Sequence, residues 1–161
     1  MSGLYAVAGS KIYISDAPVT AKGEVTAADF ADLTWVEIDG WANAGALGDT
    51  QEVGEQSLIN QRRVRKFKTI LNAGTMENQF VPMPTDPGQI KFKEAVESCQ
   101  PYAFKVEWSG DCVDPADPDA LEGMTDMFYG LALPGARSGG DAATALLRTW
   151  SIAVDSNIVE V

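Results

Sequence analysis

Hydrophobic and polar residues alternate along several stretches of the chain, most clearly between Tyr102 and Trp108. Aromatic and aliphatic side chains occupy every second position there, and small or charged residues lie between them. Successive side chains of a β-strand point to opposite faces, so this period of two predicts a half-buried strand.

Weaker alternation and runs of β-prone residues predict further strands. The first run, Leu4–Ala8, is separated from Lys11–Ser15 by Gly9 and Ser10, which predicts a hairpin. The residues between 15 and 32 are typical of a loop, with one helical turn near its end. The other predicted strands cover residues 34–38, a stretch from the basic residues at 65–68 to about 79, and residues 124–133, 146–154 and 158–161.

One segment has the signals of an α-helix, at about residues 87–99. Asp86 is suited to cap it, Pro87 suits the first helical position, and Gln89 lies three residues after the cap, as in a capping box. Apolar residues then recur at helical spacing, which predicts one buried face that includes Cys99. The apolar positions of that face are Phe92, Ala95, Val96 and Cys99.

Residues 39–61 follow no clear period, because glycines and acidic residues interrupt the segment throughout. Long segments without a period are uncommon in compact domains and are usually functional or disordered. We therefore expect a long loop at about residues 39–61 that contacts a partner. The alternative is a surface loop without a partner.

Basic residues are concentrated directly after this segment, where five of the twelve lie within seven positions. On a strand they would alternate between the two faces, so they do not form a single phosphate-binding stripe. Three interpretations remain: a partner for acidic loops of another subunit, a solvated strand, and contact with nucleic acid. The residues are Arg62, Arg63, Arg65, Lys66 and Lys68.

The chain is strongly acidic, with 12 basic and 23 acidic residues and a formal charge of -11. Such a charge repels polyanions, so tight binding of nucleic acid is not predicted. An acidic surface would suit a conduit through which DNA passes without sticking. The alternative interpretation is that the charge only keeps the protein in solution.

Composition also limits the chemistry that the sequence predicts. The chain has 161 residues, enough for one domain with a packed core, and it contains no histidine, so a zinc site is not expected. No basic region precedes the apolar N-terminal stretch, and no apolar run approaches the ~20 residues that span a bilayer. We therefore expect synthesis in the cytoplasm, no membrane and no cofactor.

A search for catalytic motifs finds no phosphate loop, nucleophile elbow or zinc-protease motif. Paired carboxylates such as Asp29 with Asp32, or Glu94 with Glu97, would act as acid and base only in a buried cleft. Nothing in the pattern predicts their burial. We therefore do not expect an enzyme.

An acidic loop is predicted at residues 111–122, and its spacing differs from the calcium-loop pattern. Cys112 lies in this loop and Cys99 near the helix end. Geometry leaves open a disulfide between them, which makes Cys99 and Cys112 a candidate cross-link.

The order of these features resembles the lambda-like major tail tube proteins of long-tailed bacteriophages. The likeness begins at about Asp32 and covers most of the chain after it. It is carried by DLTWVEIDGW (residues 32–41), QFVPMPTDPGQIKFKEAV (residues 79–96), AFKVEWSGD (residues 103–111) and MFYGLALPGARSGG (residues 127–140).

The resemblance implies a mainly β fold, a two-sheet β sandwich or barrel with one flanking helix, in a single tail tube domain spanning residues 1–161. It further implies hexameric rings that stack into a tube in the virion tail, with an acidic lumen that conducts the genome without specific binding. The implied partners are identical copies and tail proteins such as the tape measure, tail tip and terminator.

The long loop and the basic patch are the expected interface within and between rings. The candidate interface residues are Leu47, Asp49, Glu52, Glu55, Leu58, Arg62, Arg63 and Arg65.

Three other functions remain open. The tube of a contractile tail or a related secretion system has a similar fold. A ligand-binding β sandwich would use tryptophans such as Trp35 and Trp41 to stack on flat ligands. An acid-base hydrolase would depend on one essential carboxylate.

Overall fold

The computed structural model describes residues 7–108 and 124–161 of the chain. The predicted acidic loop at residues 111–122, with Cys112, lies outside the described residues. The described elements are β1 (Lys11–Ser15), η1 (Ala27–Phe30), β2 (Trp35–Ile38), β3 (Trp41–Asn43), β4 (Thr50–Gln56), β5 (Arg65–Asn72), β6 (Thr75–Phe80), α1 (Pro87–Glu97), β7 (Tyr102–Trp108), β8 (Met124–Leu133), β9 (Arg137–Ser138), β10 (Leu147–Val154) and β11 (Val159–Glu160).

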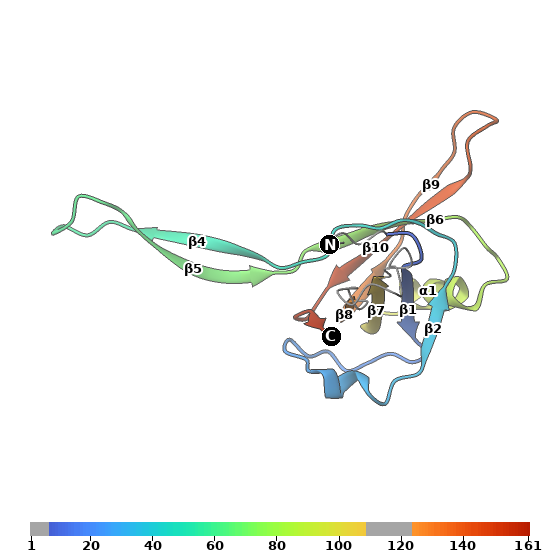
Figure 1. Cartoon of the computed structure of the whole chain (residues 1–161), viewed down its shortest axis with the longest axis horizontal. Helices are drawn as coiled ribbons and strands as arrows, with labels where there is room; N and C mark the ends of the chain where they lie inside the picture. Colours follow the sequence, from blue (N-terminus) through green and yellow to red (C-terminus); the bar gives the residue numbers. More distant parts are fainter. Residues whose placement is uncertain (1–6, 109–123) are drawn as a thin grey trace, which may run out of the picture.

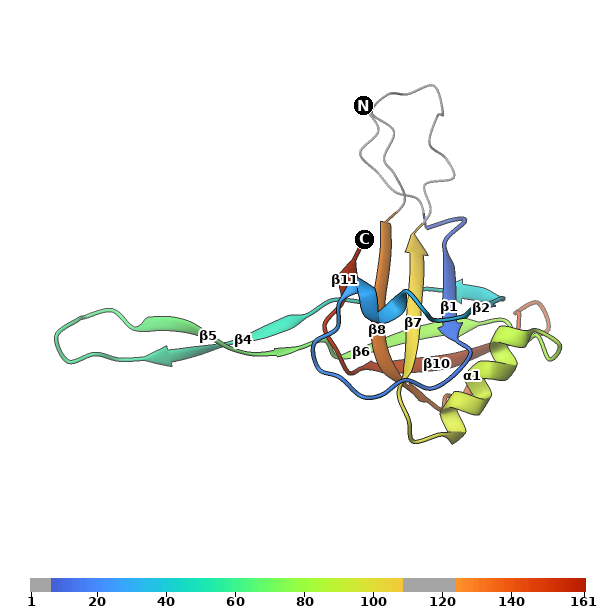
Figure 2. The ribbon, with the colours of Figure 1, turned by 90° about the horizontal axis from the view of Figure 1, so that it is seen from below.

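Most of the described strands belong to one antiparallel sheet in the order β2-β1-β7-β8-β10-β6-β3, while β11 pairs with β8 and β9 with β10. The sheet curls. Three strands separate β3 from β7 in the sheet, yet the rings of Trp41 on β3 and Trp108 on β7 have centroids only 5.8 Å apart. Figure 2 shows β1, β7 and β8 running across β6 and β10. The mainly β prediction, with strands enclosing one core and a flanking helix, is confirmed.

Strand β8 changes its pairing partner at Gly130, where the sheet bends. Up to this residue β8 pairs with β7, and from it onward β8 pairs with β10. A Cβ atom at Gly130 would lie 2.7 Å from Cγ2 of Ile152, so the close crossing of β8 and β10 requires glycine.

The core fills the concave side of the sheet, and α1 closes it. The Phe92 ring from α1 stacks on Trp150 of β10 at 4.7 Å between centroids, and both side chains are almost fully buried. Burial of such aromatic side chains is the largest stabilising contribution in a domain of this size. Other buried core residues include Ile12, Ile14, Ile38, Met76, Phe80, Phe104, Val106, Phe128 and Ile152.

The helix begins as predicted but its third residue has a different role. Asp86 caps α1 by accepting a hydrogen bond from the Gln89 N–H at 3.0 Å. The capping box is not completed, because the buried Gln89 side chain turns toward the sheet. Its amide nitrogen donates to the carbonyls of Asp39 and Val81, and its amide oxygen accepts from the Met83 N–H, each at 2.8 Å.

The predicted buried stripe of the helix is correct at Phe92 and Ala95 but wrong at Cys99. The helix ends at Glu97, so Cys99 follows it and is exposed. The proposed cross-link between Cys99 and Cys112 stays a prediction, because Cys112 lies outside the described residues.

The loop between β1 and β2 covers part of the convex face of β7 and β8. On that face of β7 Ala103 is buried, while Lys105 and Glu107 stay partly exposed, so the predicted half-buried strand is confirmed. Phe30 of η1 packs edge-on against Tyr129 at 5.2 Å and, with Val25 and Ala103, forms a second small cluster. The predicted helical turn in this loop is confirmed.

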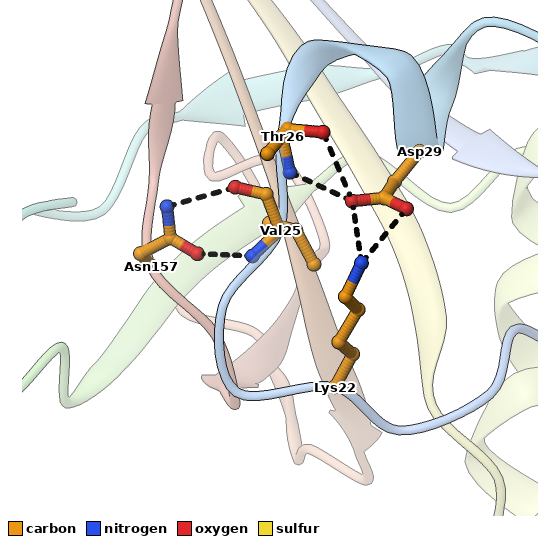
Figure 3. Close-up of polar contacts among 5 residues, drawn as sticks. All are labelled: Lys22, Val25, Thr26, Asp29 and Asn157. Atoms are coloured by element: carbon orange, nitrogen blue, oxygen red, sulfur yellow. Dashed lines mark hydrogen bonds and ion pairs between the residues drawn. The ribbon is translucent and has the colours of Figure 1, made fainter.

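Polar contacts hold this loop in place (Figure 3). The Val25 N–H donates to the Asn157 side chain at 2.6 Å, and Asn157 donates back to the Val25 carbonyl. Asp29 accepts from the Thr26 N–H at 2.7 Å and pairs with Lys22 at 3.1 Å. The Thr26 N–H bond, and then the Lys22 ammonium, lower the pKa of Asp29 below its ordinary value of 3.8.

Three predicted elements differ from the structure. Residues 4–6 of the predicted hairpin lie outside the described residues, while Val7 and Ala8 are not in a strand and β1 pairs with β2 on one edge and β7 on the other. The single strand ending near residue 79 is two strands, β5 and β6, separated at Ala73 and Gly74. The long loop at residues 39–61 contains β3 and β4.

We expect Phe92→Ala to lower the free energy of unfolding by about 3–5 kcal/mol, because it removes a fully buried ring that stacks on Trp150. Chemical denaturation followed by tryptophan fluorescence measures this loss. The exposed neighbour Lys93 is the control, and Lys93→Ala should change stability by less than about 0.5 kcal/mol. Equal stability of the two variants would contradict the central position of Phe92.

We expect Asp29→Ala to lower the melting temperature at neutral pH and to have no effect in strong acid. A carboxylate whose pKa is lowered in the folded state stabilises it fully above the unfolded pKa, and this contribution is lost as pH falls through the folded pKa. Thermal unfolding between neutral pH and about pH 2 tests this. The control is Asp32→Ala, at an exposed carboxylate of the same loop. Its melting temperature should differ from that of the wild type by the same amount at both ends of this pH range.

Candidate functional site

The β4–β5 hairpin, residues 50–72, projects from the body of the molecule (Figures 1 and 2), and we call it the arm. Among the described strands, β4 and β5 pair only with each other. Every side chain of β5 is exposed, and in β4 only Gly54 is partly covered. An isolated two-stranded ribbon is at best marginally stable in water, so the arm needs another surface to cover it.

The two faces of the arm carry different side chains. Directly paired residues share a face, so Val53 and Lys68 lie beside the pair Glu55 and Lys66. Lys66 and Glu55 are 3.8 Å apart and largely exposed, and such an ion pair adds little stability.

The opposite face of the arm carries Phe67, whose ring lies over Gly54. A Cβ atom at Gly54 would lie 2.5 Å from the Phe67 ring, so glycine provides the space for this contact. Phe67 still has 53% of its surface exposed. The ring is therefore positioned on the arm but available to a partner.

Exposed apolar side chains are concentrated on the arm. Clusters of this kind on a projecting element mark interaction surfaces. Of these residues only Leu58 is predicted as an interface residue from the sequence, because the spacing of the set follows neither a strand nor a helix period over its whole length. The exposed large apolar residues of the arm are Val53, Leu58, Ile59, Val64, Phe67, Ile70 and Leu71.

The arm also differs from the rest of the chain in charge. It holds five of the twelve basic residues but only two of the 23 acidic ones, so it carries +3 and the remaining sequence carries -14. Charges of opposite sign attract, so the arm is suited to contact with an acidic surface.

Most of the predicted interface residues lie on the arm, and two, Leu47 and Asp49, lie just before it in the chain. Glu52 and Glu55 lie on β4, Arg65 begins β5, and all are exposed. Leu47 instead packs against the core. Leu58, Arg62 and Arg63 lie in the loop that joins β4 to β5 and are exposed.

Asp49 lines a hollow of about 220 Å³ at the root of the arm. The hollow is bounded by the last residues of β5, by Val154 and the residues that follow it, and by the loop at Gly23. Asn157, which holds that loop in Figure 3, also lines the hollow, so the braced loop and the arm meet at this point.

The tryptophans proposed as ligand platforms already have partners. Trp41 packs on Trp108 and donates its indole N–H to Asn78 at 3.2 Å. Trp35 stacks on Phe30 and lies under the ammonium of Lys105. These contacts favour a packing role for both rings, although Trp41 also lines a hollow of about 250 Å³.

One carboxylate of each pair proposed for acid-base chemistry has a structural partner as well. Asp29 pairs with Lys22, and Glu94 pairs with Lys91 at 2.9 Å. Among the residues described, no three potential metal ligands lie together, and no helix is long and apolar enough to cross a membrane.

No protein-family model matches the sequence, and no curated protein matches it. Solved structures share its fold. A chain of the anti-feeding prophage baseplate has a TM-score of 0.69 at 14% identity, with 100% of this chain and 97% of that chain covered.

Two further similar chains come from an extracellular contractile injection system in the extended state. A chain of the PVC sheath/tube terminator has a TM-score of 0.67 at 8% identity, with 99% of this chain and 98% of that chain covered. A chain of the PVC sheath-tube complex has a TM-score of 0.66 at 10% identity, with 99% and 92% covered. This chain therefore has, over its whole length, the fold of chains found in contractile injection systems.

Proposed function

We propose that the chain is a structural subunit of a tail tube and that its function is to assemble with identical copies. The observation that carries this proposal is the arm, whose strands and apolar side chains no described part of the same copy covers. The likeness in fold to chains of tube-containing assemblies supports it.

Assembly would satisfy what the arm lacks in a single copy. Its outer strand edges carry N–H and C=O groups that pair with no described strand, and its apolar side chains remain in water. Contact with a second copy would bury both, and closure of a ring would leave no free subunit edge. The candidate residues Glu52, Glu55, Leu58, Arg62, Arg63 and Arg65 belong to this contact.

The proposal extends to the architecture that the resemblance implies. Six copies would form a ring, rings would stack in a virion tail, and the net charge of -11 would give a lumen that does not bind DNA. Other tail proteins would close the tube at its ends. Two of the similar chains come from an extracellular contractile injection system, which favours a contractile tail or a related injection system over a non-contractile tail.

Catalysis has no place in this proposal. The carboxylates considered for it, such as Asp29 and Glu94, make structural contacts. The ligand-binding alternative is also less favoured, because Trp35 and Trp41 are already packed against other side chains.

We expect the purified wild type to form rings or tubes at high protein concentration and Phe67→Asp to prevent this. The substitution places a charge on the exposed face of the arm but leaves the core intact, so the melting temperature should not change. Electron microscopy and sedimentation velocity measure assembly, and circular dichroism measures folding.

Ile90→Asp is the matched control, because Ile90 is an exposed apolar residue on α1 and lies off the arm. This variant should assemble like the wild type. A wild type that stays a monodisperse monomer at millimolar concentration would rule out the proposed function. Normal tubes from Phe67→Asp would rule out the arm as their interface.

A further inference from the structure

Two arginines face each other on the second projecting hairpin of the molecule. Arg137 of β9 pairs directly with Arg148 of β10, so their side chains leave the same face of the sheet. Like charges in directly opposite positions destabilise a pair of strands. The protein therefore retains an arrangement that is unfavourable in the single copy.

No described carboxylate compensates this charge. The ion pairs among the described residues involve lysines, and none includes Arg137 or Arg148. In a chain with nearly twice as many acidic as basic residues, two adjacent arginines without an acidic partner are unexpected.

The side chain of Arg148 is held in position by the core. Its guanidinium lies over the Trp150 ring, 5.0 Å from the centroid. Its Nε–H is buried and has no partner among the described residues. Because the Nε–H is covered in the single copy, an acceptor from another molecule would reach this guanidinium at its terminal nitrogens, which are not among the buried unpaired atoms.

The hairpin is accessible for such a contact. In Figure 1 it projects from the body on the side away from the arm. Arg137 is exposed, and so is Leu146, which precedes β10 and has 49% of its surface exposed. An apolar residue beside a charged pair gives the composition of a small protein interface.

We propose that Arg137 and Arg148 form a receptor for an aspartate or glutamate side chain of a second copy in the assembled tube. This inference rests on the proposed function. Guanidinium groups bind carboxylates in a bidentate geometry, and one carboxylate between two of them removes their mutual repulsion. A second copy is the favoured source, because the sequence outside the arm carries -14 and offers many carboxylates.

The test compares Arg137→Gln, Arg137→Lys and the control Lys93→Gln, which removes a charge from an exposed position on α1. Arg137→Gln should raise the protein concentration needed for assembly by about tenfold or more, because one partner of an interfacial charge pair is lost. Its melting temperature as a monomer should equal or exceed that of the wild type, because the repulsion between the arginines is removed.

Arg137→Lys keeps the charge but loses the bidentate geometry, so its assembly concentration should lie between those of the wild type and Arg137→Gln. Lys93→Gln should assemble like the wild type. Assembly of Arg137→Gln at the wild-type concentration, or a lowered melting temperature of its monomer, overturns the receptor.

The two proposals fail in different ways. If the wild type assembles, Phe67→Asp does not, and Arg137→Gln assembles normally, only the receptor is wrong. If the wild type never assembles, both are wrong. A fluorescein-labelled single-stranded oligonucleotide that binds the wild type but not Arg137→Gln would assign the arginines to nucleic-acid phosphates and also overturn the receptor.

Discussion

The structure depends on the packing of one helix into the concave side of a curled sheet. A sheet that curls must fill its inner face, and here the Phe92 ring from α1 does so by stacking on Trp150. The same helix is tied to the sheet by Gln89, whose side chain bonds to the backbone at Asp39, Val81 and Met83. These contacts hold β2, the turn that follows it and the end of β6 together, and so they position the segment that leads into the arm.

Apolar side chains are covered in the body of the molecule but remain exposed on the arm. Within the body, apolar side chains from seven elements meet in one core, and a loop covers part of the outer face of β7 and β8. The arm has no such cover, yet it retains exposed apolar residues and paired strands. A ribbon of this kind gains stability only from a surface outside it, which is the physical basis for assigning it to assembly.

The features that reduce the stability of a single copy lie at the surfaces proposed for contact. On the arm, Phe67 exposes an apolar ring to water. On the β9–β10 hairpin, Arg137 and Arg148 place like charges opposite each other. Local conflicts of this kind are expected where function, and not stability, determines the residue. The two hairpins project on different sides of the body, so one copy has two separate surfaces for the proposed contacts (Figure 1).

Elements that have one face in the core could be predicted from the sequence alone. Alternation at Tyr102–Trp108 and the Asp86-Pro87 start of the helix predicted β7 and α1, because burial on one side produces a periodic pattern. The sequence did not predict β4, since both faces of that strand meet water and nothing makes its residues alternate. The binding of Gln89 to the sheet and the pairing of Arg137 with Arg148 were visible only in the folded chain. Each of these depends on which distant segments become neighbours, and local spacing carries no information about that.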